Sequence, residues 1–198
     1  MTTQSPNLLR LVEDSYRQHF EVPPVRASVS FVGVEPIEIL RFDERAEQDP
    51  FGIAHYLSLG MSRYPMTDST DLVVDEAGAP RAELLITARG RPDDLWRQLA
   101  VLAAAPAVEG AVYSAGNRAD LGQPLVAGSR CTGGVLATGP MRPVTAPGIS
   151  EVHILRLLPA TATELAWARV HGSEQLIERW TTWKVDLNDL LRDPVSLD

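Results

Sequence analysis

The residue types that most often bind metals or act as nucleophiles are few in this sequence and far apart. The histidines are His19, His55, His153 and His171, and the single cysteine is Cys131. A zinc site needs three or four such ligands converging at about 2 Å. The ligands here are too dispersed along the chain for such a site, so the sequence predicts no metal. His153, in a predicted strand, and His171, at a predicted helix end, are expected to be structural.

Phosphate-binding and covalent catalytic motifs are also missing from the sequence. The only lysine, Lys184, follows Trp183 in a predicted helical stretch without a glycine-rich loop, which excludes a P-loop. Ser129 and Cys131 lie in the glycine-rich segment 128–134, but this segment lacks the G-x-S-x-G spacing of a nucleophile elbow. We therefore expect a protein with no catalytic residues and no cofactor.

Two charged residues stand inside apolar segments that are predicted to be strands. Glu83 lies in the segment 81–88 and Arg156 in the segment 152–158. An ionised group in such a strand must find a partner or change its pKa. We expect a structural role for both, either paired with each other or exposed at an edge, with ligand binding as the alternative. Glu164 is expected to be structural as well, because its spacing from Thr161 fits a capping box.

The segment Gly60–Met66 combines a turn glycine, two thioethers and an aromatic ring directly after a predicted strand. Methionine adapts to varied partners when it is exposed and fills gaps when it is in a core. In the first case Met61, Ser62, Tyr64 and Met66 form a candidate partner-binding surface. In the second case the methionines belong to the core, and both interpretations stay open.

The segment 43–49 is acidic and has no apolar period. Such a segment is typical of a solvated loop, and the sharper alternative is an acidic contact surface for a basic partner. The residues that would form this surface are Asp43, Glu44, Glu47 and Asp49.

The overall composition is that of a globular protein with an acidic surface. The chain has 198 residues, 44% of them hydrophobic and 22% charged, and a net charge of −8. This charge repels phosphate backbones and favours basic partners, so nucleic acid is not expected as a ligand. The apolar run 99–108 contains Pro106 and is far shorter than the roughly 20 residues of a membrane span. The N-terminal sequence does not resemble a signal peptide, and we expect a cytoplasmic protein, monomeric or weakly dimeric.

Hydrophobic periodicity and turn residues predict the helices and strands. A first helix begins after Ser5–Pro6 and ends at Pro23, and a second begins after Pro92 with Leu95, Leu99 and Leu102 on one face. Predicted strands cover residues 29–34, 37–42, 53–59, 72–74, 81–88, 111–113, 134–137 and 152–158. The first two are joined across Glu35–Pro36, and the last is ended by Pro159. A helix from the capping box to Gly172 and a helix capped by Ser173, with Leu176, Ile177, Trp180 and Trp183 on one face, complete the chain.

Several strands with apolar residues on both faces require cover on both sides. We therefore expect a single α/β domain with α+β character, in which helices sandwich a mixed sheet. The proposed parts are an N-terminal helix in residues 1–24, a main domain in residues 25–182, and a C-terminal tail or docking extension in residues 183–198.

Several short motifs resemble the Suppressor of fused domain family in their order and spacing, over roughly residues 25–182. They are Gly60-Met61-Ser62, Pro65-Met66, Arg81-Ala82-Glu83-Leu84, Asp120-Leu121-Gly122, Pro124-Leu125, Gly128-Ser129, Ile154–Leu157 before Pro159, Glu164–Trp167, and His171-Gly172 to Leu176. The resemblance implies a mixed α/β domain that binds protein and has no known catalytic centre. Animal members sequester a transcription factor in a cleft between two domains, and we expect this chain to match the first domain alone.

The resemblance leads to one preferred function and two alternatives. Bacterial members of similar length are regarded as immunity proteins that neutralise toxins of polymorphic toxin systems, and an acidic protein suits a basic toxin domain. The first alternative is a regulatory adaptor for an endogenous protein. The second is a small-molecule-binding protein or enzyme with a pocket near Gly60–Met66 that uses Glu83, Asp120 or Arg156.

Overall fold

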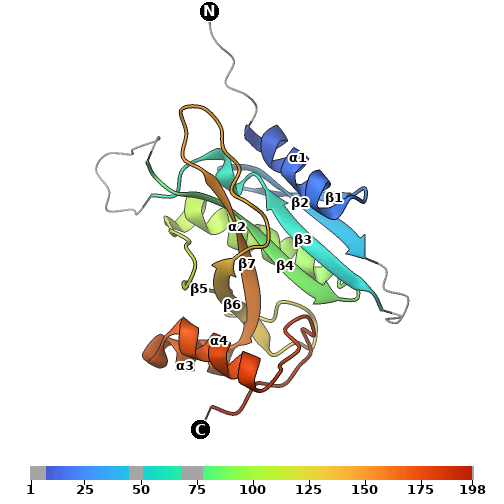
Figure 1. The fold of residues 1–198 in the computed structure, drawn as a ribbon, viewed down its shortest axis with the longest axis vertical. Coiled ribbons are helices and arrows are strands. Elements are labelled where there is room, and N and C mark those ends of the chain that lie inside the picture. The colour runs from blue at the N-terminus through green and yellow to red at the C-terminus, as the bar shows by residue number, and fades with distance from the viewer. Residues whose placement is uncertain (1–7, 45–50, 68–77, 198) are drawn as a thin grey trace, which may run out of the picture.

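The computed structural model describes residues 8–44, 51–67 and 78–197 (Figure 1). In chain order its elements are α1 (Leu8–Phe20), β1 (Val25–Phe31), β2 (Val34–Glu44), β3 (Ile53–Leu59), the 3-10 turn η1 (Met61–Arg63), β4 (Arg81–Arg89), α2 (Asp94–Glu109), β5 (Arg118–Asp120), β6 (Cys131–Thr138), β7 (Val152–Thr161), α3 (Ala162–His171) and α4 (Ser173–Thr182). The predicted start of the first helix at Ser5 and the predicted strand 72–74 lie outside the described residues.

The strands form one mixed sheet in the order β1-β2-β3-β4-β7-β6-β5. Strands β4 and β7 run parallel, with Arg81 opposite Val152, and the other neighbouring strands are antiparallel. Helix α2 covers one face of the sheet, and α1 lies on the opposite face (Figure 1). Helices α3 and α4 cover the β6–β7 end. The predicted fold class, a mixed sheet between helices in a single domain, is confirmed.

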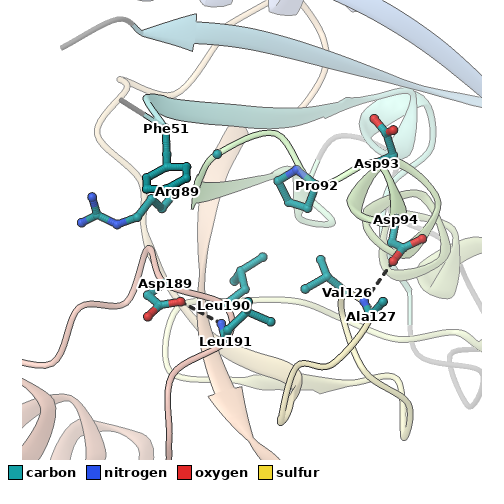
Figure 2. A pocket seen from close by; sticks show the side chains of 11 residues that line it. Phe51, Arg89, Pro92, Asp93, Asp94, Val126, Ala127, Asp189, Leu190 and Leu191 are labelled. Carbon is teal, nitrogen blue, oxygen red and sulfur yellow. Dashed lines mark hydrogen bonds between the residues drawn. The ribbon is translucent and has the colours of Figure 1, made fainter. Parts of the chain in front are cut away.

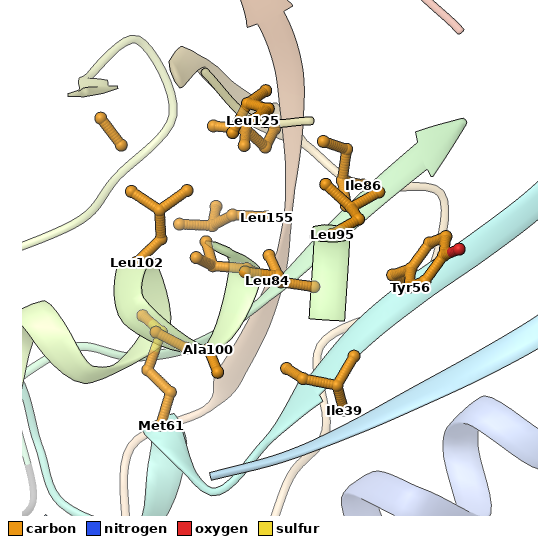
Figure 3. Close-up of a cluster of buried hydrophobic side chains, with 14 of the residues drawn as sticks. Ile39, Tyr56, Met61, Leu84, Ile86, Leu95, Ala100, Leu102, Leu125 and Leu155 are labelled. Carbon is orange, nitrogen blue, oxygen red and sulfur yellow. The ribbon is translucent and has the colours of Figure 1, made fainter. Parts of the chain in front are cut away.

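Strand β4 explains why both faces of the sheet need cover. Successive side chains of a strand point to opposite faces. Leu84 and Ile86 pack with Leu95 of α2 (Figure 3), whereas Leu85 belongs to the cluster under α1 with Val12. These side chains are almost fully buried, and burial of each contributes about 1.5–3 kcal/mol to stability. The prediction that β4 carries apolar residues on both faces is confirmed.

The hairpin of β1 and β2 turns earlier than the sequence predicts. The predicted turn is Glu35–Pro36, but Phe31 pairs with Val34, which leaves a two-residue turn at 32–33. Gly33 has a φ of +79°, which other residues rarely adopt and which such a tight turn requires. The proline lies inside β2 at an irregularity of the register, where a missing N–H is tolerated.

Three other predicted boundaries are wrong. Residues 111–113 form no strand. Strand β7 continues through Pro159 to Thr161, because its pairing with β4 ends at Arg156 and the proline has a strand neighbour on one side only. Ser173 is the first residue of α4 and its hydroxyl does not cap the helix; instead it accepts a hydrogen bond from Arg118 at 3.3 Å.

The second helix of the predicted C-terminal pair, α4, also differs in part from the prediction. The capping box of Thr161 and Glu164 is present, and α3 ends at His171 with Gly172 as its C-terminal cap, as predicted. In α4, Leu176 and Trp180 are buried, but Trp183 follows the helix end and is 63% exposed. The apolar face of α4 is therefore one turn shorter than its periodicity indicates.

Residues 183–197 lie against α3, α4 and the end of β7, and a buried ion pair holds them there. Glu164 is fully buried and accepts a bidentate pair of hydrogen bonds from Arg192, at 2.9 and 2.8 Å. The same carboxylate accepts hydrogen bonds from Trp180 Nε1 at 3.1 Å, Val195 N at 3.0 Å and Thr161 N at 2.8 Å. One side chain thus starts α3, positions α4 and fixes the C-terminal segment.

Burial raises the pKa of Glu164, but the hydrogen bonds from Arg192 and from the Val195 and Thr161 N–H groups, with the Arg192 charge, lower it by more. The net pKa lies below the ordinary value of 4.5. The carboxylate is therefore charged and paired at neutral pH.

We expect Arg192→Met to lower the free energy of unfolding by about 3–5 kcal/mol, because it leaves a buried carboxylate without its cation. Arg130→Met is the matched control, since the pair of Arg130 with Asp193 is mostly exposed (67% and 82%) and is worth at most about 1 kcal/mol. Urea denaturation measures both. Equal losses in the two variants would contradict a special role for the buried pair.

The lowered pKa of Glu164 also predicts a pH dependence. Its contribution to stability is complete above the unfolded pKa near 4.5 and is lost as the pH falls through the lower folded pKa. The melting temperature of Glu164→Gln should therefore fall less than that of the wild type between about pH 5 and pH 3. Glu178→Gln, an exposed change on α4, should keep the wild-type profile. Parallel curves for all three proteins would refute this assignment.

Candidate functional site

The segment Gly60–Met66 closes one end of the helix–sheet sandwich. Strand β3 ends at Leu59, and Gly60 turns the chain with a φ of +131°. A Cβ at this position would also lie 3.4 Å from the carbonyl oxygen of Pro36. The turn η1 then contacts β4, α1 and α2. Glycine is favoured here by its backbone conformation, because other residues rarely adopt this φ.

Glu83 of β4 is the centre of this end of the molecule. It is fully buried, and its Oε1 accepts hydrogen bonds from Gly60 N and Ser62 N, both at 2.9 Å, and from Ser62 Oγ at 2.7 Å. Its Oε2 accepts one from Ser58 Oγ at 2.5 Å. All four donors are neutral groups. Ser58 Oγ in turn accepts a hydrogen bond from Leu84 N at 2.8 Å. This gives the Leu84 N–H a partner at a point where the β3–β4 pairing has ended.

Two further side chains attach this turn to its neighbours. Tyr16 of α1 donates its hydroxyl to the carbonyl oxygen of Ser58 at 2.8 Å. Burial, and then the charge of Glu83, raises the pKa of Tyr16 well above its ordinary value, so the phenol remains a donor. Arg81 Nη1 donates to the carbonyl oxygens of Ser62 and Arg63 at 2.9 and 2.8 Å. We call Tyr16, Ser58, Gly60, Ser62 and Glu83 the Glu83 network.

The suggested pair of Glu83 and Arg156 is not made. Arg156 lies on the same face of β7 as Ile154 and Leu158, and its guanidinium is 3.5 Å from Asn188 Oδ1. Glu83 uses turn donors instead. The sequence could not show this, because only the pairing of β4 with β7 places Glu83 opposite Ile154 and Arg156 opposite Leu85.

The structure separates the residues that the sequence placed in one partner-binding surface. Met61, Ser62 and Met66 are buried, and the two methionines belong to the same core cluster as the apolar face of α2; Met61 is shown there in Figure 3. Tyr64 is 58% exposed. The cavity beside it has a volume of only about 40 Å³, whereas small-molecule sites commonly reach about 300–1,000 Å³.

The acidic residues are also arranged differently from a continuous charged surface. Asp43 pairs with Arg41 at 2.9 Å and with Arg91 at 3.2 Å. Glu44 approaches His55 Nε2 at 3.3 Å. Glu47 and Asp49 lie outside the described residues. The charge of Asp43 is therefore balanced locally, whereas burial lowers the pKa of His55, so Glu44 contacts a neutral ring.

A larger apolar pocket opens between the end of β4, the start of α2 and the C-terminal segment, and we call it the tail pocket (Figure 2). Its volume is about 430 Å³. In Figure 2, Phe51 and Pro92 face Val126, Leu190 and Leu191 across the opening. The full lining is Phe51, Arg89, Gly90, Pro92, Asp93, Asp94, Val126, Ala127, Asp189, Leu190 and Leu191.

Backbone contacts hold the walls of the tail pocket. Arg89 N donates to Asn188 O at 2.7 Å, and the Ser129 hydroxyl donates to Leu190 O. Asp94 accepts a hydrogen bond from Ala127 N at 2.9 Å. The sequence did not predict this pocket. Its residues were interpreted separately, as a helix start, a turn and a docked tail, and nothing in the sequence indicated that they meet.

The residues with nucleophilic potential are also engaged structurally. Ser129 Oγ accepts from Cys131 N at 3.0 Å. Burial raises the pKa of the Cys131 thiol, which keeps it protonated and unreactive. Within the described ranges, no three His, Cys, Asp or Glu side chains are grouped as a metal site. None of the helices in that part of the chain has the length and apolar character of a membrane span.

Comparison with solved structures identifies the fold. A suppressor of fused homolog from Neisseria gonorrhoeae superposes with a TM-score of 0.70 at 16% identity, covering 97% of this chain and 98% of that chain. A chain of the Sufu-Fu complex gives 0.74 at 14% identity, with 97% and 93% covered. Drosophila Suppressor of Fused gives 0.73 at 14% identity, and this chain spans 52% of its length. Curated protein sequences give no match.

The fold is an α+β domain built on a mixed seven-stranded sheet. The model of the family described as Suppressor of fused protein (SUFU) matches residues 33–193. This chain belongs to that family, as the short motifs predicted. The match extends beyond residue 182, so it includes much of the segment expected to be a separate tail.

We expect Glu83→Ala to lower the free energy of unfolding by about 3 kcal/mol or more, because it leaves buried donors of the turn and of Ser58 unpaired. Glu83→Gln should cost less, since its amide oxygen still accepts from the turn. Exposed Glu109→Ala is the control and should change stability by at most about 0.5 kcal/mol. Thermal and urea unfolding measure the effect. An unchanged melting temperature in Glu83→Ala would contradict a structural role for the network.

Proposed function

We propose that this protein acts by binding another protein and has no catalytic activity of its own. The observation that carries the proposal is the open tail pocket, whose apolar walls include Phe51 and Leu191, which are 70% and 63% exposed. Large exposed apolar side chains around a concave site favour protein contacts. Membership of the SUFU family supports the proposal, and one related fold is known from a complex, the Sufu-Fu complex.

More specifically, we propose a cytoplasmic immunity protein that neutralises a basic toxin domain. The net charge of −8 supports attraction of a basic partner. An inhibitor of this kind needs no chemistry, because it covers the active surface of the toxin. Complexes of DNase toxins with their immunity proteins are among the tightest protein pairs known, which shows that surface complementarity alone is sufficient for neutralisation.

A regulatory adaptor for an endogenous protein is the second candidate, since it requires the same kind of surface. A small-molecule site or enzyme near Gly60–Met66 is less well supported. The cavity there is about 40 Å³, and the nearby Glu83 is enclosed by its own hydrogen bonds.

Co-expression tests the immunity role against the adaptor role. The C-terminal domain of a large secreted protein encoded beside this gene would be expressed in bacteria with and without this chain. We expect growth arrest without it, rescue with it, and a stable complex on size-exclusion chromatography. A neighbouring domain that is harmless, or one that stays toxic and unbound, would exclude immunity.

For such a partner, we expect the association rate to fall as salt rises, because exposed charges are screened over about 8–10 Å. Tyr64→Ala should mainly raise the dissociation rate, as for an aromatic anchor. Val32→Ser is the control, an apolar residue on the β1–β2 turn that is more exposed than Tyr64. Surface plasmon resonance gives both rates. Salt-independent association would show that the partner is not steered by charge. Equal dissociation rates for the wild type and both variants would show that Tyr64 is not an anchor.

A further inference from the structure

We propose that the tail pocket receives a segment of the partner in which an apolar side chain stands next to a basic residue. This inference rests on the proposed protein-binding function and specifies the chemistry that the site recognises. It is carried by the juxtaposition of an apolar floor with carboxylates that have no cationic partner among the described residues.

The floor and walls of the tail pocket suit one large aliphatic or aromatic side chain. Val126 and Leu190 are buried at its base, and Leu190 is part of the main core. Phe51 and Leu191 stand above them and are accessible (Figure 2). An inserted apolar side chain would remove Phe51 and Leu191 from water, contact the buried pair beneath them, and gain about 25 cal/mol for each Å² of apolar surface that it covers.

The charges around the opening select a cation beside that apolar group. The rim carries Asp93, Asp94 and Asp189, and no ion pair joins any of them to a cation in the described part of the chain. The cation that also lines the pocket, Arg89, is bound to Asp186 at 2.7 Å, and its guanidinium points away from the opening (Figure 2).

Two of the three rim carboxylates, Asp94 and Asp189, are held in place by backbone hydrogen bonds. One oxygen of Asp94 accepts from Ala127 N at 2.9 Å, and one oxygen of Asp189 accepts from Leu191 N at 2.9 Å. Each keeps its second oxygen for a ligand. In Figure 2, Asp93 and Asp189 lie at opposite ends of the opening, so a basic residue on either side of the inserted side chain meets a carboxylate.

The arrangement is formed before any partner binds. The N–H of Arg89 and the hydroxyl of Ser129 tie the C-terminal segment to the sheet, and Arg192 ties it to α3. A preformed site avoids part of the entropy cost of binding. This favours recognition of a short segment rather than a large flat contact.

Short fluorescein-labelled peptides test the proposal on the full chain by fluorescence anisotropy. The probe has a central leucine–phenylalanine pair flanked by arginines. One matched peptide replaces the arginines with glutamates, and another replaces the central pair with serines. We expect the basic apolar peptide to bind best, with an affinity that falls as salt rises. Equal binding of all three peptides, or binding of none, would overturn the proposal.

Variants then locate the binding site. Asp93→Asn with Asp189→Asn should weaken binding of the basic apolar peptide roughly threefold to tenfold, as expected for two accessible charge pairs. Leu191→Ser should weaken it about fivefold or more through lost apolar contact. Exposed Glu174→Gln and Val170→Ser, on α4 and α3, are the charge and apolar controls and should bind as the wild type does. Unchanged melting temperatures verify folding.

The same variants separate this inference from the proposed function. If a cognate protein partner binds the wild type and the pocket variants equally, the partner uses another surface and the inference fails while the function stands. If the peptide binds through the pocket but no partner protein is neutralised, the function fails and the site stands. Dimers that disappear in Leu191→Ser would assign the pocket to a second copy of this chain and overturn the proposal.

Discussion

Burying a carboxylate that forms no ion pair costs free energy, and one end of this protein is arranged to give such a carboxylate hydrogen-bond donors instead. No ion pair joins Glu83 to a cation in the described part of the chain. Glu83 is enclosed by the N–H groups of Gly60 and Ser62 and by two serine hydroxyls. Leaving such a group unpaired would cost several kcal/mol. The requirement bends the chain after β3 into a tight turn, and that turn contacts both α1 and α2. One side chain therefore fixes a turn that contacts helices on opposite faces of the sheet.

A second buried carboxylate organises the other end by different means. Glu164 is neutralised by Arg192, which follows it by 28 residues, and this pair brings the C-terminal segment back onto the sheet. The returning segment contributes Leu190 and Leu191 to the tail pocket. A structural ion pair thus creates the wall of the candidate binding site, and the stability of the pair and the shape of the pocket are coupled.

The net charge of the chain is less informative than the way in which its charges are paired. Asp43 is paired with Arg41 and Arg91, whereas the carboxylates at the rim of the tail pocket have no such cationic partners within the described ranges. An attractive field is strongest where charge is not balanced locally. The acidic surface that we propose for a partner therefore lies beside an apolar pocket, where electrostatic steering and apolar burial act together.

The sequence by itself determined the features that depend on near neighbours. The capping box of Thr161, the apolar face of α2 and the two-sided strand β4 follow from spacing alone, and ordered short motifs were enough to indicate the family. Only the tertiary structure decided what meets Glu83, because its donors lie 21–25 residues earlier in the chain. It also decided that Met61 and Met66 are buried, and it assembled the tail pocket from segments near residues 51, 90, 126 and 190. Local periodicity reports which side chains avoid water, but the partner of a buried charge and the walls of a pocket depend on which distant segments the sheet brings together.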